Sequence, residues 1–362
     1  MSKVLFLLQL PPPIHGSSVM GDVLYKSHLI NTSFGCSHIN LMTSRKLNEI
    51  GKNPLKKVFR YAKIFLKLLH QLILFNPDLV YFAINAKGIA FYKDFILILL
   101  IKLFRKKYLL HFHNKGVSES NNLLDVLSYR LLFNNSKVIL LTPRLYRDIS
   151  NYIDINHVFY SPNGISMPKY QIKKRRKKKI VKLLFLSNLF FTKGVFVLVN
   201  ALYILKKQNL NFQCNIVGGE GDISFQLIQK KINELGLNKH IKLHGKKFGN
   251  DKFKFYEKSD IFIFPSYYET FGLVNLEAMF FGLPVISTDE GGIPDIIDDK
   301  ITGLIAKKRD SVDLAKKIKF LITNPKISKI MGQKGRDKFF NCYTTNIFEK
   351  RIKNIINDCI KS

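Results

Sequence analysis

The feature that most restricts the fold of this chain is a repeated alternation of short apolar runs with longer amphipathic stretches. The apolar runs are rich in Val, Ile, Leu and Phe, as buried strands are, and stretches such as 54–75 and 194–208 have helical spacing. Strands that alternate with helices form parallel sheets covered by helices on both faces. The predicted strands are Val4–Leu8, Leu79–Phe82, Tyr108–His111, Val138–Leu141, Lys182–Leu186, Cys214–Val217, Ile261–Phe264 and Pro284–Ser287.

The alternation occurs on both sides of the basic run Lys173–Lys179, and a chain of 362 residues is long enough for two cores. Consecutive cations repel one another, so we interpret this run as a solvated linker; a lipid or phosphate patch is the alternative. We therefore predict two Rossmann-like, doubly wound α/β domains facing a cleft, residues 1–168 and 169–342. A C-terminal helix, residues 343–362, is expected to pack back on the first domain.

The charge balance is extreme, because 58 Lys and Arg stand against 26 Asp and Glu and give a net charge of +32. Three explanations stay open: the bias of an AT-rich genome, an anionic membrane surface and nucleic acid. Nucleic acid is not expected, because no basic motif interleaved with aromatic residues occurs. No apolar run is long enough to span a bilayer; the nearest is Phe95–Ile101, with Lys and Arg following at 102–107. A cytoplasmic protein, peripheral on the inner face of the cytoplasmic membrane, fits this pattern.

The cysteines and the N-terminus agree with that compartment. Cys36, Cys214, Cys342 and Cys359 show no CxxC and no metal-type spacing, as expected of reduced thiols. The N-terminal apolar run is predicted to be a strand and not a signal peptide, because no small-residue cleavage site follows it. No D-x-D motif occurs, and we expect no metal cofactor.

In the first half, two loops that follow predicted strands are candidates for binding. Gly16 and two serines open a helix whose free N–H groups favour an anionic ligand; a plain turn capped by Ser is the alternative. His113 follows the strand Tyr108–His111 at the end where ligands bind, whereas His111 lies within the strand and is expected to be packed. His113 is a candidate to reach a substrate, although an isolated histidine is equally consistent with a structural role.

In the second half, Asn188 and then Lys193 follow the strand Lys182–Leu186 as a helix begins. A lysine there adds a full charge to the partial charges of the helix N–H groups, which suits a diphosphate; one more surface lysine is the alternative. Gly219 lies in the next turn, where glycine lets a backbone approach a ligand closely. A tight turn without a ligand is equally consistent.

The segment 262–294 holds the clearest binding pattern. Glu269 lies in the loop after a strand, and Glu277 lies two turns into the following helix, on the side of the cleft. Carboxylates accept hydrogen bonds from paired sugar or ribose hydroxyls, although solvated glutamates are the alternative. N–H groups exposed at the helix start suit a phosphate. They belong to Phe271, Gly272 and Leu273.

The segment PSYYETFGLVNLEAMFFGLPVISTDEGGIPDII resembles the E-x7-E segment of retaining glycosyltransferases of the family 4 type, which have the two-domain GT-B fold. FLSNLFFTKG, VGGEGD and ITGLIAKK are similar to other donor-domain segments of that family. NPDLVYF, YSPNGI and MGQKGRDKFF extend the resemblance over nearly the whole chain. PPPIHGSS and HFHNKG resemble a subgroup that builds bacterial surface polysaccharides.

The resemblance implies transfer of a hexosyl-type sugar from a UDP- or GDP-linked donor to a lipid-linked or polysaccharide acceptor, in capsule, O-antigen or lipopolysaccharide synthesis. The second domain would hold the donor. Lys193 would contact its diphosphate, with the N–H groups at the helix start, Glu269 its sugar and Glu277 its ribose. Asn188 departs from the Arg of many members and leaves Lys193 with less help.

The first domain would hold the acceptor. Gly16 would line the phosphate side of that domain, and His113 would approach the sugar or the acceptor. Two alternatives stay open. A sugar-nucleotide epimerase on the same two-domain plan would convert a sugar nucleotide without an acceptor, and a nucleic-acid-binding protein would use the basic charge alone.

Overall fold

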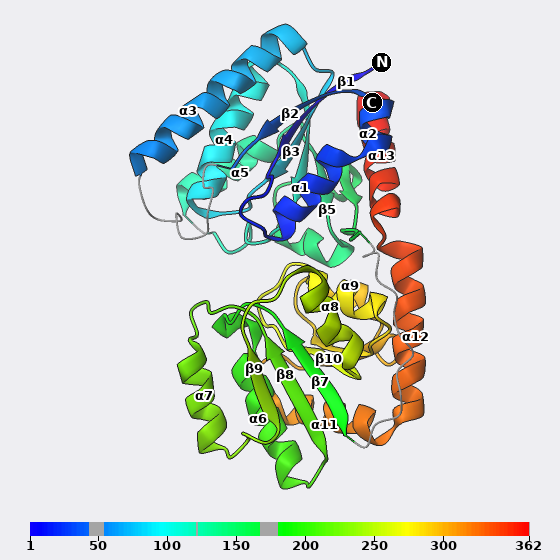
Figure 1. Cartoon of the computed structure of the whole chain (residues 1–362). Helices are drawn as coiled ribbons and strands as arrows, with labels where there is room; N and C mark the ends of the chain where they lie inside the picture. Colours follow the sequence, from blue (N-terminus) through cyan, green and yellow to red (C-terminus); the bar gives the residue numbers. More distant parts are fainter. Residues whose placement is uncertain (43–53, 121, 167–179, 362) are drawn as a thin grey trace. The chain divides into compact units, whose positions relative to one another are not determined.

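The structure is a computed structural model that describes residues 1–42, 54–120, 122–166 and 180–361. The chain forms two compact units, Met1–Gly164 with Thr345–Ser362 and Ile165–Thr344, each with its own parallel sheet of six strands (Figure 1). The prediction of two Rossmann-like α/β domains is confirmed. The basic run 173–179, interpreted as a linker, lies outside the described residues.

The sheet of the first unit has the strand order β2-β1-β3-β4-β5-β6, with every neighbouring pair parallel. Four of its strands were predicted, because they are continuous apolar runs buried on both faces. The two edge strands β2 and β6 were missed. The strands are β1 Lys3–Leu8, β2 Gly35–Asn40, β3 Leu79–Ile84, β4 Lys107–Phe112, β5 Lys137–Leu140 and β6 Val158–Tyr160.

Helices cover both faces of this sheet, with α1, α2 and α13 on one face and α3, α4 and α5 on the other (Figure 1). The helix predicted at 54–75 is present, but its last turn, η2 Gln71–Phe75, is a π-helix. No helix in the described ranges is long and apolar enough to cross a membrane. The helices are α1 Gly16–Lys26, α2 His28–Ser33, α3 Pro54–His70, α4 Gly88–Leu103, α5 Leu123–Phe133, α13 Thr345–Lys361 and the 3-10 turns η3 Pro143–Asp148 and η4 Ile155–His157.

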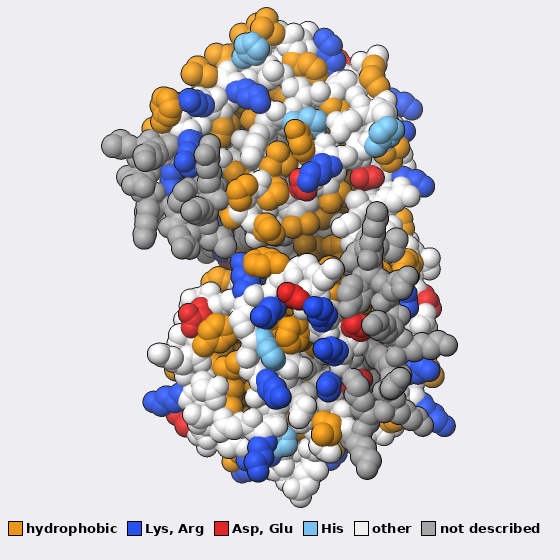
Figure 2. Space-filling model, in the orientation of Figure 1, with side chains coloured by type: hydrophobic (Ala, Val, Ile, Leu, Met, Phe, Trp, Pro, Cys, Tyr) orange, Lys and Arg blue, Asp and Glu red, His pale blue; other side chains and the backbone are white. Residues whose placement is uncertain are grey.

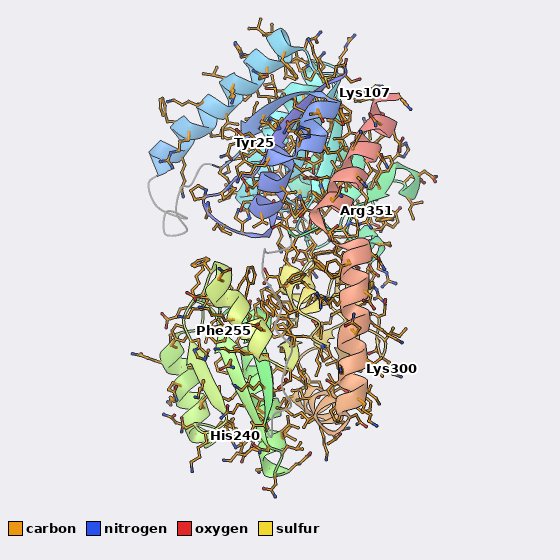
Figure 3. The ribbon with its side chains drawn as sticks, turned by 45° about the vertical axis from the view of Figure 1, so that its right-hand side comes forward. Tyr25, Lys107, His240, Phe255, Lys300 and Arg351 are labelled. Atoms are coloured by element: carbon orange, nitrogen blue, oxygen red, sulfur yellow. The ribbon has the colours of Figure 1, made fainter. Side chains whose placement is uncertain are left out.

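The C-terminal helix α13 completes the core of the first unit, as expected. Its buried residues follow helical spacing, so one face of the helix packs against the strands β1, β3 and β4 and against α2. Lys107 Nζ, at the start of β4, also donates to the carbonyl of Ile360 at 3.2 Å (Figure 3 labels Lys107). The residues buried from α13 are Phe348, Ile352, Ile355, Ile356 and Cys359.

Truncating this face is expected to destabilise the first unit. Ile356 is fully buried in the core, so Ile356→Ala removes apolar contacts and leaves a cavity. We expect the free energy of unfolding to fall by about 2–5 kcal/mol, measured by urea denaturation. Asn354→Ala, on the exposed face of the same helix, is the matched control and should change it little. An equal effect of the two substitutions would contradict the packing.

The second unit has the strand order β12-β11-β10-β7-β8-β9, again parallel throughout. The four predicted strands are confirmed, β12 corresponds to the segment ITGLIAKK, and β9 was missed. Strands are β7 Val181–Leu186, β8 Phe212–Val217, β9 Ile241–His244, β10 Ile261–Phe264, β11 Val285–Thr288 and β12 Gly303–Ala306. Helices are η5 Phe191–Lys193, α6 Val195–Lys207, α7 Phe225–Glu234, α8 Gly249–Lys258, α9 Leu273–Phe280, α10 Ile293–Ile296, α11 Ser311–Thr323 and α12 Pro325–Cys342.

The order of the strands creates a topological switch point in the second unit. β7 and β10 are neighbours, but the chain continues from β7 to β8 on one side and from β10 to β11 on the other. The loops after these two strands therefore diverge, and ligands of open α/β sheets bind at such a switch point. In the first unit the same reversal occurs between β1 and β3.

Candidate functional site

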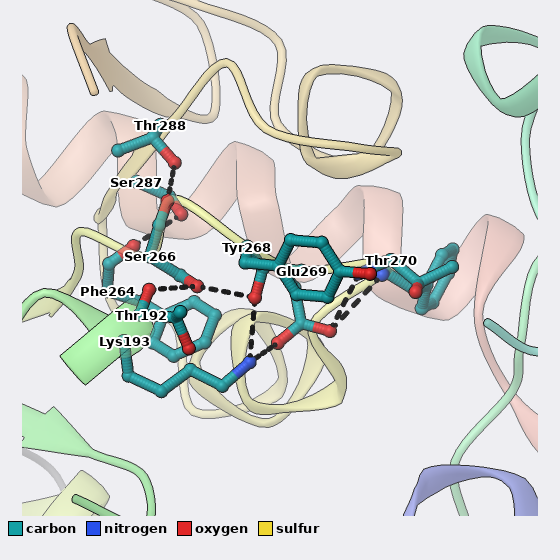
Figure 4. A network of polar contacts seen from close by, with 10 residues as sticks. Thr192, Lys193, Phe264, Ser266, Tyr268, Glu269, Thr270, Ser287 and Thr288 are labelled. Carbon is teal, nitrogen blue, oxygen red and sulfur yellow. Dashed lines mark hydrogen bonds and ion pairs between the residues drawn. The ribbon is translucent and has the colours of Figure 1, made fainter. Parts of the chain in front are cut away.

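The switch point of the second unit joins two predicted site residues. Lys193 ends the loop after β7, and Glu269 lies in the loop after β10. Lys193 Nζ donates to Glu269 Oε2 at 2.9 Å and to the carbonyl of Tyr268 at 3.0 Å (Figure 4). Each of the two side chains is 20% exposed, so the pair is accessible from solvent but largely desolvated. The two opposite charges compensate each other in this largely buried place.

Backbone groups fix the Glu269 carboxylate from its other side. Its Oε1 accepts hydrogen bonds from the N–H groups of Thr270 (3.0 Å) and Phe271 (3.4 Å). Gly291 packs closely against this loop. A Cβ on Gly291 would lie 2.2 Å from the carbonyl oxygen of Glu269, and the φ of Gly291 is +54°. Gly292 N–H donates to the carbonyl of Thr270 at 2.9 Å. The Gly-Gly turn after β11 therefore supports the Glu269 loop.

Gly194 brings the loop after β7 against the loop after β10. Its φ is +76°, and a Cβ would lie 2.1 Å from the carbonyl oxygen of Pro265, so no larger residue fits. Tyr267 N–H (2.9 Å) and Ser266 Oγ (3.2 Å) both donate to the carbonyl of Thr192. These contacts set the position of Lys193 relative to the strand ends.

The start of α9 forms the next part of the site. Gly272 is its N-cap, with φ of +83°, and Leu273 is its first residue. N–H groups of a first helical turn have no partner within the helix and carry partial positive charge. Of the three residues predicted to offer N–H groups to a phosphate, Phe271 differs from the other two. Its N–H already donates to Glu269, and its side chain is buried. The N–H groups of Gly272 and Leu273 belong to the turn that a phosphate would meet.

Glu277, on α9, is also paired. Its Oε1 accepts from Lys252 Nζ at 2.5 Å and its Oε2 from the Tyr256 hydroxyl at 2.8 Å, both on α8. Burial, and next the charge of Glu277, raise the pKa of Tyr256 well above its usual range, which keeps the hydroxyl as a donor. Lys252 and Tyr256 were not identified from the sequence. Their spacing from Glu277 along the chain gives no signal, because the contact depends on how α8 packs beside α9.

Asn188 and Gly219 lie together at the ends of β7 and β8. Asn188 Oδ1 is 3.5 Å from the place of a Cβ on Gly219, and Lys246 side-chain carbons are 3.4 and 3.5 Å from it. The glycine that permits close approach is Gly218, where a Cβ would lie 1.8 Å from the carbonyl oxygen of Ser187. Lys246 follows β9 and was missed with that strand. It is exposed and has no carboxylate partner among the described residues.

In the first unit, Gly16 is the first residue of α1, as expected, but the cap is His15. His15 Nδ1 accepts from Ser18 N–H at 3.3 Å, and Ser18 Oγ accepts from His15 N–H at 2.9 Å. The reciprocal bonds form a capping box, so one N–H group of this turn already has a partner. The predicted capping by Ser is therefore partly right, with His as the cap and Ser as its counterpart.

His113 and His111 lie at the end of β4. His111 is fully buried, as predicted, and its Nδ1 is hydrogen-bonded to the Tyr81 hydroxyl. The His111 and His113 rings are 4.1 Å apart between centroids. Burial lowers the pKa of His113 to about 4; Asn163 partly opposes this, and the nearby charge of His15 adds to it. His113 is therefore neutral at pH 7 and available for a hydrogen bond, not for charge pairing.

The lowered pKa predicts an acid-sensitive first unit. An unfolded histidine has a pKa of about 6.5, so between pH 6.5 and about 4 the unfolded chain binds more protons at this position. The contribution of His113 to stability is complete above this window and is lost as the pH falls through it. We expect the free energy of unfolding to fall less steeply between pH 7 and 4.5 in His113→Asn than in the parent, by urea titration at each pH. Exposed His157→Asn is the control, and equal slopes for parent and His113→Asn would refute the assignment.

No group of three or more His, Cys, Asp or Glu side chains that could hold a metal ion occurs in the part of the chain that the structure describes. The positive groups described above are Lys193, Lys246 and Lys252, together with the partial charges at the start of α9.

Two units of Rossmann type with a site at the carboxyl ends of the strands define the GT-B architecture. Residues 166–338 match the family model described as glycosyl transferases group 1. The matched range covers most of the second unit, Ile165–Thr344. The first unit lies outside the matched range.

Curated relatives and solved structures agree with this assignment. The capsular polysaccharide biosynthesis glycosyltransferase CapM of Staphylococcus aureus is 27% identical over 216 residues, 56% of this chain and 55% of CapM. The amylovoran biosynthesis glycosyltransferase AmsK of Erwinia amylovora is 28% identical over 225 residues, 59% of this chain and 55% of AmsK. The chain thus spans about half the length of the curated relatives it matches. HepE of Anabaena in complex with UDP shares the fold, with a TM-score of 0.75, 17% identity and coverage of 98% of this chain and all of HepE.

Proposed function

We propose that this protein is a retaining glycosyltransferase. It moves a hexosyl-type sugar from a nucleotide-sugar donor to a lipid-linked or polysaccharide acceptor in the synthesis of a bacterial surface polysaccharide, in capsule, O-antigen or lipopolysaccharide. The observation that carries the proposal is the Lys193–Glu269 pair at the switch point of the family domain. The polysaccharide class rests on CapM and AmsK, whose names give that role.

The pair suits a ligand that has both phosphate and hydroxyl groups. Lys193 Nζ and Glu269 Oε2 are hydrogen-bonded to each other. A donor would give Lys193 a diphosphate oxygen, with the first turn of α9 beside it, and would give Glu269 the sugar hydroxyls. Backbone N–H groups already orient Glu269, so exchange of partners needs little rearrangement.

Glu277 is proposed to bind the two ribose hydroxyls of the donor. Tyr256 and Lys252 hold its carboxylate in place from α8, which leaves the remaining lone pairs for hydroxyl donors. The donor is a UDP- or GDP-sugar, and the UDP complex of HepE favours UDP.

In the proposed reaction an acceptor hydroxyl oxygen bonds to the anomeric carbon while the bond from that carbon to the diphosphate oxygen breaks. The hydroxyl proton passes to the leaving diphosphate. The anomeric configuration is retained when the acceptor attacks from the same face of the sugar that the diphosphate leaves. Negative charge grows on the diphosphate, so Lys193 and the N–H groups of α9 stabilise the transition state. We propose that these groups act without a metal ion, and that His113 of the first unit approaches the sugar or the acceptor as a neutral group.

Loss of either member of the pair is expected to abolish transfer while the fold survives. Lys193→Ala removes charge stabilisation and Glu269→Ala the sugar contact, so each should lower kcat by at least about 100-fold. The assay follows release of UDP or GDP from a panel of sugar nucleotides. Lys231→Ala, which breaks the exposed pair with Glu234 on α7, is the matched control. Full activity in both site variants would refute the site, and turnover of the donor without an acceptor to an isomeric sugar nucleotide would favour the epimerase.

Lys246 is proposed as a second cation for the diphosphate, since it lies beside Asn188 and Gly219 and has no carboxylate partner in the described part of the chain. Lys246→Ala should weaken binding of UDP by roughly tenfold, as expected for one charge-assisted contact, and leave uridine unaffected. Calorimetric titration with UDP and uridine measures both. Lys247→Ala is the matched control, being adjacent and equally exposed. Asn188→Arg should restore UDP affinity in the Lys246→Ala background, and equal loss for UDP and uridine would contradict the role.

A further inference from the structure

Three helices of the first unit lie side by side and form one layer. Tyr61 of α3 donates its hydroxyl to the carbonyl of Lys93 on α4 at 2.7 Å. Lys102 of α4 donates to the carbonyl of Asn134, at the end of α5, at 2.8 Å. Figure 1 shows the same order, α3, α4 and α5, across one face of the sheet. Their outer faces therefore form one continuous surface, which we term the α3–α4–α5 face.

Apolar side chains form rows on this face, although each helix also buries an apolar row against the sheet. The outward rows have helical spacing. On α4 and α5 the members are three and then four residues apart, and on α3 they are seven apart. Each member is 41–75% exposed. Exposed apolar residues scattered singly need no explanation, but contiguous rows mark an interaction surface. The rows are Phe59, Leu66 and Ile73 from α3 and η2, Ile96, Leu99 and Leu103 from α4, and Leu124, Leu127 and Leu131 from α5.

The charges of the same helices have one sign. Their sequences contain eight Lys and Arg but only two acidic residues, Asp94 and Asp125. Both are buried: Asp94 Oδ2 accepts from Asn85 N–H at 2.9 Å, and Asp125 Oδ2 from Asn122 Nδ2 at 2.8 Å. Every exposed residue described on the three helices is apolar, glycine or basic. Figure 2 shows orange and blue side chains together where Figure 1 draws α3.

This composition indicates the chemistry of the partner that the face would bind. Helices of the second unit also expose apolar residues, but they carry acidic ones as well, such as Asp313 on α11 and Asp337 on α12. A face that is apolar and cationic, without an exposed carboxylate, complements a surface that is apolar inside and anionic at its boundary.

We propose that the α3–α4–α5 face docks on an anionic phospholipid bilayer. The apolar rows enter the headgroup boundary and the Lys and Arg side chains contact lipid phosphates, while the sheet side of the helices stays packed. The inference rests on the proposed function, in which the first unit receives a lipid-linked acceptor. The predicted membrane segment 95–107 contributes only its outward row, because Leu97, Ile98, Leu100 and Ile101 are buried.

Vesicle co-sedimentation tests the proposal with the whole chain and vesicles of phosphatidylcholine, with or without phosphatidylglycerol. Binding is expected only with phosphatidylglycerol and should decrease with salt, because salt screens the phosphate contacts. Replacing Leu124, Leu127 and Leu131 together by Ser should weaken binding at least about tenfold. Replacing Lys63 and Arg130 by Gln should weaken it and lower its salt dependence.

Matched variants of the second unit are the controls: Val312→Ser with Ile330→Ser for the apolar change, and Lys326→Gln with Lys329→Gln for the charge change. They should bind as the parent does, and thermal unfolding checks that every variant is folded. Absence of binding, or equal loss in face and control variants, would overturn the proposal. The proposal would also be overturned if the parent bound no vesicles but self-associated in size-exclusion chromatography, and if the leucine variant abolished that self-association.

A thermal-shift titration with UDP- and GDP-sugars on the same preparation separates the two proposals. A parent that binds a sugar nucleotide but no vesicles refutes only the membrane face. A parent that binds vesicles but no sugar nucleotide refutes the glycosyltransferase.

Discussion

The site of the second unit depends on one topological constraint: two adjacent parallel strands whose following loops run in opposite directions. Lys193 and Glu269 are 76 residues apart in sequence, yet their side chains meet at 2.9 Å because β7 and β10 end side by side. Two glycines beside these residues allow the loops to approach closely enough for this contact. Gly194 and Gly291 each leave room for a carbonyl oxygen of the loop after β10, and no side chain fits at either place.

Ion pairing compensates the charges that lie partly buried at this switch point. Half-buried carboxylates and lysines are costly if they stand alone, and here each of the two glutamates has its own lysine. The large positive charge of the chain therefore does not accumulate at this place: the pairs are neutral, and Lys246 is the described lysine beside Gly219 without a carboxylate partner. On the α3–α4–α5 face the positive charge lacks exposed counter-charges.

The central strands were predictable because a strand buried on both faces is a continuous apolar run, as in Ile261–Phe264. Edge strands lack that signal. β2 is half-exposed along most of its length, β6 has three residues, and β9 alternates polar and apolar groups. Lys246 was not predicted as a site residue because it follows β9, which was itself not predicted. The glutamates were found from spacing and glycine pattern, but their partners were not, since Lys252 and Tyr256 reach Glu277 only through the packing of α8 beside α9. The roles assigned to these residues remain predictions.

The position of α13 has a consequence for the order in which the protein is made. The first unit begins with β1 but takes a core helix from residues 345–361, which are synthesised after the whole second unit. Domains generally fold as they leave the ribosome. Here the second unit has all of its strands before the first unit has its full core, with Phe348, Ile352 and Ile356 arriving last. During synthesis, the apolar sheet face that α13 covers therefore stays exposed until residues 345–361 have been made.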